Sequence, residues 1–119
     1  MQKITRGSAL VVLSLALCGA SVGIAQTVED EIKAVGLAWE EAYNAGDVDG
    51  VVAVHAEDAV VMPPGFPAVV GIDAVRADAE AFFSEYSTDH AMKIQNILVE
   101  GDIAIEWAEY TDILTPKAG

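Results

Sequence analysis

Five side chains of types that carry chemistry lie at or beside apolar positions of this sequence: Trp39, Tyr43, His55, Glu106 and Tyr110. His55 is the best candidate for a catalytic base, because the ordinary pKa of an imidazole lies close to neutral pH. The alternative is a neutral histidine that lies on the apolar face of a helix and makes a single hydrogen bond. The sequence leaves both interpretations of His55 open.

Glu106 is the second candidate for acid–base catalysis. Ala104 and Ala108 lie on the same face of its strand and leave space around the carboxyl group. If that face points inward, burial would raise the pKa of Glu106 and suit it to proton transfer. The opposite face is apolar as well, with Ile103, Ile105 and Trp107. Alternation along the strand therefore leaves the orientation of Glu106 open.

The predicted ligand-binding residues are Trp39, Tyr43, Met62 and Tyr110, of which Trp39 and Tyr43 can also donate a hydrogen bond. Packing in the core is the alternative role for these two rings, because they share the apolar stripe of one helix. The two histidines lie 35 positions apart, and neither has metal-ligand spacing around it. We therefore predict no metal site, and we expect no cofactor.

Three helices are predicted to position these side chains. The first begins at Thr27, with Asp30 three residues on, and ends at Asn44-Ala45-Gly46, where a glycine suits the left-handed helix end. Its apolar stripe is Val28, Ile32, Val35, Trp39, Ala42 and Tyr43. Asp47 caps a second, short helix that runs to His55. A third helix runs from Ile72 to about Tyr86, and Arg76 and Glu80 form a predicted surface ion pair on it.

The remaining segments predict strands. Ala59–Met62 is a short strand that ends at a pair of prolines, followed by a loop over residues 64–67. Apolar alternation from His90 slips phase after Ile94, which predicts a β-bulge. Glu100-Gly101-Asp102 predicts a hairpin turn into a strand from Ile103 to Leu114. Helices that precede strands favour an α+β fold, with three helices on a curved antiparallel sheet. The last strand would leave an open edge, so we expect the chain to be truncated at its carboxyl terminus or completed by another chain.

Residues 1–25 are typical of a secretory signal peptide. Lys3 and Arg6 precede an apolar run over residues 8–17, and small residues follow as far as Ala25. We predict cleavage near Ala25, a mature domain of residues 26–119, and a periplasmic or secreted location. The alternative is an uncleaved membrane anchor, for which the apolar run is short. Cys18 lies within the segment that cleavage would remove.

The charge of the predicted mature chain excludes some classes of partner. Four basic and 19 acidic residues remain after residue 25, a net charge of −15. Nucleic-acid binding requires basic residues that neutralise phosphates, so we exclude a nucleic-acid partner. We expect no membrane partner after signal cleavage, since anionic membrane surfaces attract basic segments.

The motifs together resemble the nuclear transport factor 2-like superfamily, and more narrowly its SnoaL-like, domain-of-unknown-function 4440 branch. They are the Asn44-Ala45-Gly46-Asp47 turn, Glu57-Asp58-Ala59, Met62-Pro63-Pro64-Gly65, and Glu106-Trp107 after Gly101-Asp102. The resemblance runs from Val28 to Gly119. It implies a cone formed by a curved sheet around helices, with a cavity at its wide end, a homodimer through the sheet, and two strands beyond Gly119.

The resemblance leaves the function open, because members of the superfamily include isomerases, cyclases, dehydratases, hydrolases and proteins without catalysis. The position of the steroid isomerase's tyrosine falls on Trp39 and that of its aspartate base on Pro63, which cannot act as a base. We therefore predict a domain that binds a small apolar or carbonyl-containing molecule in a hydrophobic cavity. The alternatives are an acid–base enzyme that uses His55 or Glu106, and a dimerisation domain without a ligand.

Overall fold

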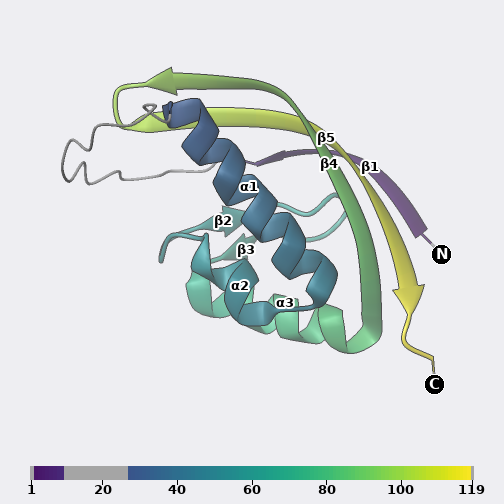
Figure 1. The fold of residues 1–119 in the computed structure, drawn as a ribbon. Helices are drawn as coiled ribbons and strands as arrows, with labels where there is room; N and C mark the ends of the chain where they lie inside the picture. Colours follow the sequence, from purple (N-terminus) through teal and green to yellow (C-terminus); the bar gives the residue numbers. More distant parts are fainter. Residues whose placement is uncertain (1, 10–26, 119) are drawn as a thin grey trace.

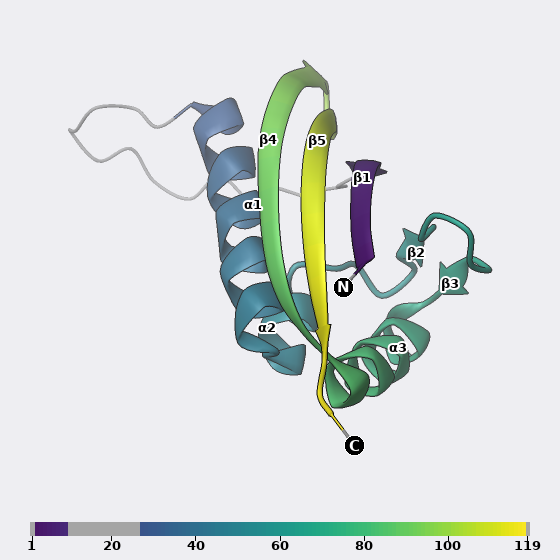
Figure 2. The same ribbon diagram turned by 90° about the vertical axis from the view of Figure 1, so that its right-hand side faces the viewer.

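The computed structural model describes residues 2–9 by their backbone and residues 27–118 in full. Three helices lie on the concave side of a curved antiparallel sheet, as Figures 1 and 2 show. This arrangement confirms the predicted α+β fold. Most of the predicted signal peptide, residues 10–25 with Cys18 and the cleavage site, lies outside the described residues.

The predicted ends of the first helix are confirmed. Helix α1 covers Val28–Ala45 and begins with a reciprocal capping box, in which the Asp30 amide donates to Thr27 Oγ1 at 3.1 Å. It ends at Gly46, whose φ of 66° places it in the left-handed region that favours glycine. The Gly46 amide donates to the carbonyls of Ala42 and Tyr43, so the turn satisfies backbone acceptors that the helix end would otherwise leave free.

Helix α2 covers Val48–Ala53, and Oδ1 of its predicted cap Asp47 accepts a hydrogen bond from the Gly50 amide at 3.1 Å. Helix α3 covers Ile72–Glu85. The predicted ion pair between Arg76 and Glu80 is wrong. Arg76 instead contacts Asp49 of α2 at 2.7 Å, because the packing of α2 beside α3 brings a closer carboxylate to the guanidinium group.

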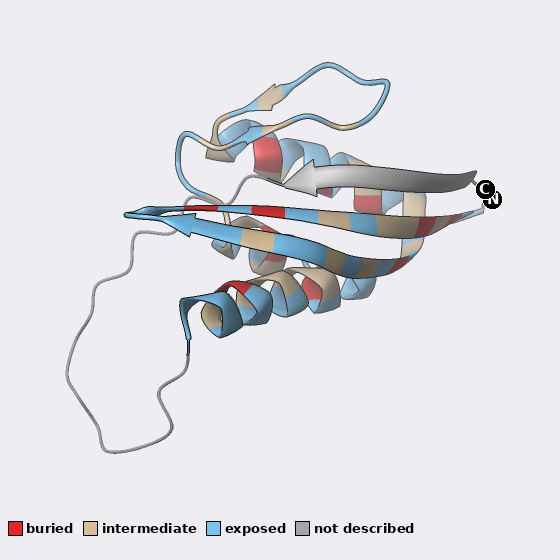
Figure 3. Cartoon of the chain, turned by 90° about the horizontal axis from the view of Figure 1, so that it is seen from above, coloured by how far each residue is buried: buried red, intermediate tan, exposed pale blue. Residues whose placement is uncertain are grey.

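The core lies where the three helices meet the sheet. Ala42, Val51, Ala79 and Phe83 form one buried cluster, with one or more residues from each helix. Partly buried side chains pack against this cluster, namely Trp39, Tyr43, Val48 and Phe82. Figure 3 shows the buried positions on the helices and on the sheet that they cover. Two of the predicted site residues, Trp39 and Tyr43, therefore border the core.

The sheet is built from a long hairpin. Strands β4 (Tyr86–Glu100) and β5 (Ile103–Pro116) pair antiparallel through the predicted turn, where Gly101 has a φ of 57°. Their register shifts between Ile94 and Asn96, which confirms the predicted bulge. On β5 the buried residues are Ala104, Glu106, Asp112 and Leu114. The opposite face exposes Ile103, Ile105 and Trp107, so the structure turns Glu106 inward.

The second edge of β5 differs from the prediction. Strand β1 (Gln2–Ala9) pairs antiparallel with β5 from Leu114 to Glu106, so the edge that we expected to be open is covered. The unpaired backbone groups of an edge strand readily bond to another extended segment, which accounts for the pairing. Strands β2 (Val60–Val61) and β3 (Val69–Val70) form a separate two-stranded ladder, and only the first of them was predicted. Among the described residues, no helix is long and apolar enough to cross a membrane.

Candidate functional site

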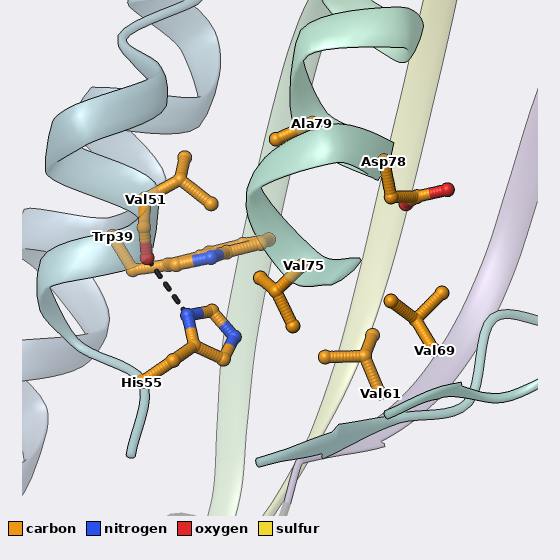
Figure 4. A pocket seen from close by; sticks show the side chains of 8 residues that line it. All are labelled: Trp39, Val51, His55, Val61, Val69, Val75, Asp78 and Ala79. Atoms are coloured by element: carbon orange, nitrogen blue, oxygen red, sulfur yellow. Dashed lines mark hydrogen bonds between the residues drawn. The ribbon is translucent and has the colours of Figure 1, made fainter. Parts of the chain in front are cut away.

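A small pocket opens between the helices and the β2–β3 ladder, with a volume of about 80 Å³. Figure 4 shows the eight residues that line it: Trp39, Val51, His55, Val61, Val69, Val75, Asp78 and Ala79. Apolar side chains supply most of this lining, and His55, Asp78 and the Trp39 indole supply its polar groups. The pocket thus has the composition of a small-molecule site, in which a few polar groups orient a ligand among apolar walls.

His55 lies two residues beyond the end of α2, which is shorter than the predicted helix, and it starts the segment that leads to β2. Its Nδ1 lies 2.8 Å from the Val51 carbonyl oxygen, which can only accept a hydrogen bond, so Nδ1 carries the hydrogen. In the neutral ring Nε2 is then the acceptor. Figure 4 shows this second nitrogen turned toward Val61 and Val75, inside the pocket. The geometry therefore presents one basic nitrogen to whatever occupies the pocket.

A second polar group lies deeper, on the inner face of the sheet. His90 of β4 and Asp112 of β5 are opposite each other in register, and His90 Nδ1 lies 2.9 Å from Asp112 Oδ1. Their side chains are 4% and 9% exposed. His90 Nε2 is buried and has no hydrogen-bond partner among the described residues. An aspartate that orients an imidazole in this way leaves the far nitrogen available as a proton acceptor.

Aromatic rings surround His90. The ring centroids of Trp39, Tyr43 and Tyr110 lie 5.1, 5.3 and 5.2 Å from that of His90, and Trp39 stacks on Tyr43 at 4.7 Å. We call these five residues, His90, Asp112, Trp39, Tyr43 and Tyr110, the His90 cluster. Trp39 belongs both to this cluster and to the pocket lining. A single indole therefore adjoins both His90 and the pocket.

The two tyrosines of the His90 cluster stay protonated. Burial, followed by the charge of Asp112, raises the pKa of Tyr43 well above its ordinary value of 10.0, and the same two causes raise the pKa of Tyr110. Both phenols therefore keep their hydrogens at neutral pH and remain donors. The cluster contains no lysine or arginine.

Helix α1 fixes the position of His90. The Asn44 side chain donates to the His90 carbonyl at 2.9 Å and accepts from the His90 amide at 2.7 Å. Two further bonds join the same elements, from the Met92 amide to Glu40 Oε2 at 2.8 Å and from Thr88 Oγ1 to the Tyr43 carbonyl at 3.0 Å. Side chains of the helix thus satisfy an edge of β4 that would otherwise bond to water or another strand.

Glu106 is buried, with 4% of its surface exposed, and its Oε2 has no partner among the described residues. Burial raises the pKa of its carboxyl group above the ordinary 4.5. It lies opposite Ile97, toward the hairpin end of the sheet, and does not line the pocket. The structure therefore does not bring Glu106 together with His55.

The other predicted site residues fall in different places. Met62 is 77% exposed and lies outside the pocket lining, although its neighbour Val61 is part of it. Tyr43 and Tyr110 contact His90 rather than the pocket. Pro63, at the position of the isomerase's base, does not line the pocket. Of the named candidates, only Trp39 and His55 meet there.

Sequence analysis missed the pairing of His90 with Asp112. A signal for it existed, because His90 begins the apolar alternation of one strand and Asp112 follows Glu106 and Tyr110 on one face of the next. Neighbouring strands place such polar residues side by side only in the correct register, which the sequence alone left undefined. Within residues 27–118, no group of three or more potential metal ligands is found.

Comparison with solved structures gives several similar folds. A ketosteroid isomerase-like protein from Erwinia carotovora atroseptica SCRI1043 is 29% identical with a TM-score of 0.62, covering 71% of this chain and 72% of that protein. A conserved protein from Planctomyces limnophilus DSM 3776 is 21% identical with a TM-score of 0.67, covering 75% and 70%. An epoxide hydrolase from M. tuberculosis, described as LEH-like, is 20% identical with a TM-score of 0.51, covering 68% and 59%. At these last two identities the likeness concerns the fold alone.

Comparison with curated proteins gives no match. A family model described as the SnoaL-like domain matches residues 37–119, which include the pocket, the His90 cluster and the whole hairpin. This match covers more than half of the chain, and the solved structures above share the fold. The chain therefore belongs to the SnoaL-like domain family.

Proposed function

We propose that this domain binds a small, mainly apolar molecule in the pocket between Trp39 and His55. The pocket geometry supports the proposal, because apolar walls surround a single imidazole nitrogen whose tautomer is fixed by the Val51 carbonyl. An engineered apolar cavity of about 150 Å³ holds benzene. A pocket of about 80 Å³ therefore holds a group of a few atoms, and the rest of a larger ligand extends through its mouth.

A thermal-shift screen with small apolar alcohols, ketones and lactones tests this binding. Members that fit should raise the melting temperature saturably in the wild-type protein. In the wild-type protein, the alcohols, ketones and lactones should raise the melting temperature more than hydrocarbons of the same shape. His55→Phe, which keeps a ring but removes both nitrogens, should abolish this difference. Glu57→Gln, an exposed change on the next segment, is the matched control and should leave the response unchanged. A flat response across the panel would contradict the proposal.

Acid–base catalysis on a carbonyl-containing or polyketide-like substrate is the second candidate function. One observation favours it: Nε2 of His55 faces the pocket and can accept a proton beside the Trp39 indole, which can donate a hydrogen bond. The similarity to a ketosteroid isomerase-like protein supports the same class of chemistry. If His55→Ala and Glu106→Gln both left turnover of an enolisable ketone intact, this assignment would fail.

We also propose that the protein forms a homodimer through the outer face of its sheet. Four apolar residues support this, because Leu98, Ile103, Ile105 and Trp107 are between 41% and 51% exposed and lie on one face near the hairpin turn. Contiguous exposed apolar surface of this kind is typical of an interface. Light scattering should give twice the monomer mass, and Ile105→Lys should give the monomer mass. Lys93→Glu, on the same face but outside the apolar group, is the control.

Export is the last part of the proposal. The basic start and apolar run of residues 1–25 support it, and the mature domain would begin near Gln26 without strand β1. Mass spectrometry of the protein expressed in a Gram-negative host should give the mass of residues 26–119 in the periplasmic fraction. The mass of the whole chain in the cytoplasmic fraction would contradict export. Replacement of Ala25 by a bulky residue should block the cleavage.

A further inference from the structure

We infer that the pocket extends past Trp39 to the buried Nε2 of His90, and that this nitrogen accepts a hydrogen bond from the hydroxyl group of an uncharged aromatic ligand. The inference rests on the proposed small-molecule binding and names its ligand class. It also assigns a binding role to a residue outside the pocket lining.

His90 Nε2 is a polar atom that the folded chain leaves without a partner. The side chain is 4% exposed, its other nitrogen is bonded to Asp112, and no described residue reaches Nε2. Folded proteins pair nearly all of their buried polar atoms, because an unpaired one loses its hydration without compensation. Asp112 keeps the hydrogen on Nδ1, so the neutral ring presents Nε2 as an acceptor. The missing partner is therefore a hydrogen-bond donor.

Trp39 lies beside both the pocket and the His90 ring. Its indole lines the pocket, and its centroid lies 5.1 Å from that of His90 with the two rings nearly perpendicular. Trp39 is half-buried rather than enclosed, so fewer contacts hold its ring in place than would hold a fully buried one. The pocket of about 80 Å³ has roughly half the volume of an engineered cavity of about 150 Å³ that holds benzene, so we expect an aromatic ring to need more room. Displacement of the indole would supply both the missing volume and access to His90.

The surrounding residues select an uncharged aromatic molecule. Tyr110 stacks on His90 at 5.2 Å, and Tyr43 meets it nearly at right angles at 5.3 Å. Trp39 stacks on Tyr43, so a ligand ring can take the stacking place that Trp39 leaves. Asp78 at the pocket and Asp112 in the cluster disfavour an anionic ligand, and no lysine or arginine lines either part. A hydroxyl group on the ring supplies the donor that Nε2 lacks. A phenol is the simplest such ligand.

Tryptophan fluorescence tests the inference directly, because the chain has two tryptophans and one substitution leaves Trp39 as the only one that emits. The Trp107→Phe protein, with the full chain otherwise intact, keeps Trp39 as the sole tryptophan. Titration with phenol should change its emission saturably, and phenol should bind about tenfold more tightly than toluene, which has a methyl group in place of the hydroxyl. His90→Phe in the same background should bring the two affinities together. Glu57→Gln in the same background, an exposed change outside the pocket lining, should leave the preference for phenol in place.

The outcomes separate this inference from the proposed function. If His55→Phe removed the preference and His90→Phe retained it, the inference would be overturned while the pocket itself remained a binding site. If neither probe, and no member of the thermal-shift panel, bound saturably, both would fail. Nitrogen-15 NMR of the imidazoles in wild-type protein avoids any dependence on the folding of a variant. Phenol should shift the His90 Nε2 resonance and toluene should not; an unchanged resonance at saturating phenol would overturn the inference.

Discussion

Asn44 bonds to both backbone polar groups of His90, donating to its carbonyl at 2.9 Å and accepting from its amide at 2.7 Å. The carboxamide thus takes the place of a neighbouring strand along one residue of β4. Asn44 belongs to the turn that ends α1, so the turn that marks the family in the sequence also fixes the histidine in the sheet. The ends of α1 and the His90 cluster are therefore one structural unit.

Asn44→Ala should lower the free energy of unfolding by about 1–3 kcal/mol, because it removes two hydrogen bonds to part-buried backbone groups. Asn44→Asp should fall between this variant and the wild type, since the carboxylate keeps the acceptor and loses the donor. Urea denaturation measures both. Asn96→Ala is the control, because the one hydrogen bond of the Asn96 side chain within residues 27–118 is accepted from the adjacent Ile97 amide in an exposed position, and it should change stability by less than about 0.5 kcal/mol. Equal losses at positions 44 and 96 would contradict the prediction.

Glu106→Gln should stabilise the fold at pH 7 by about 1 kcal/mol, because it removes a charge that is buried without a partner. Burial raises the pKa of Glu106 in the folded state above its ordinary 4.5. Between these two pKa values the folded state holds more protons than the unfolded state, so stability falls as the pH rises through this interval. The difference between variant and wild type should therefore disappear below about pH 4.

Thermal unfolding of both proteins from about pH 3 to about pH 8 measures this effect. Glu100→Gln is the matched control on the same sheet. Glu100 is exposed, so this substitution removes no buried charge and should not give the stabilisation expected for Glu106→Gln. A Glu106→Gln protein that was less stable than the wild type at pH 7 would show that the carboxylate has a partner in solution.

Gly50→Ala should destabilise the fold by about 1–3 kcal/mol, although alanine favours helices over glycine. A Cβ at position 50 would lie 2.7 Å from the Cβ of Ala42, so the backbone of α2 touches α1 there. Ala42→Gly should recover part of the loss in the double variant. Gly36→Ala is the control inside α1, where the nearest atom is the flexible end of Met92 at 3.2 Å, and it should be neutral or stabilising. A stabilising Gly50→Ala would mean that the helices sit further apart.

The Arg76–Asp49 ion pair should contribute about 0.2–1 kcal/mol, because both side chains are exposed. A double-mutant cycle with Arg76→Ala and Asp49→Ala measures this coupling, and 0.5 M salt should weaken it. The same cycle between Arg76 and Glu80 should give a smaller coupling. If the coupling of Arg76 with Glu80 were larger than its coupling with Asp49, the ion pair that the sequence suggested would be the correct one.

Local sequence signals determined the elements of this protein. Thr27 with Asp30, Gly46 and Asp47 fix helix ends through hydrogen bonds to residues a few positions away. Gly101 fixes the hairpin turn through its positive φ, so no tertiary information is needed to place these ends. The phase slip after Ile94 predicted the bulge for the same reason. The α+β class followed from the order of these elements, and the family from a resemblance of short motifs such as Asn44-Ala45-Gly46-Asp47.

Tertiary structure alone decided which polar groups meet. His90 and Asp112 become partners only through the register of β4 with β5, and Glu106 turns inward because the helices cover that face of the sheet. Arg76 pairs with Asp49 because α2 packs against α3. Trp39 and His55 meet at one pocket across two helices, while Met62 remains at the surface. These contacts join residues far apart in the chain, so their geometry depends on packing and register, which composition and periodicity leave undefined.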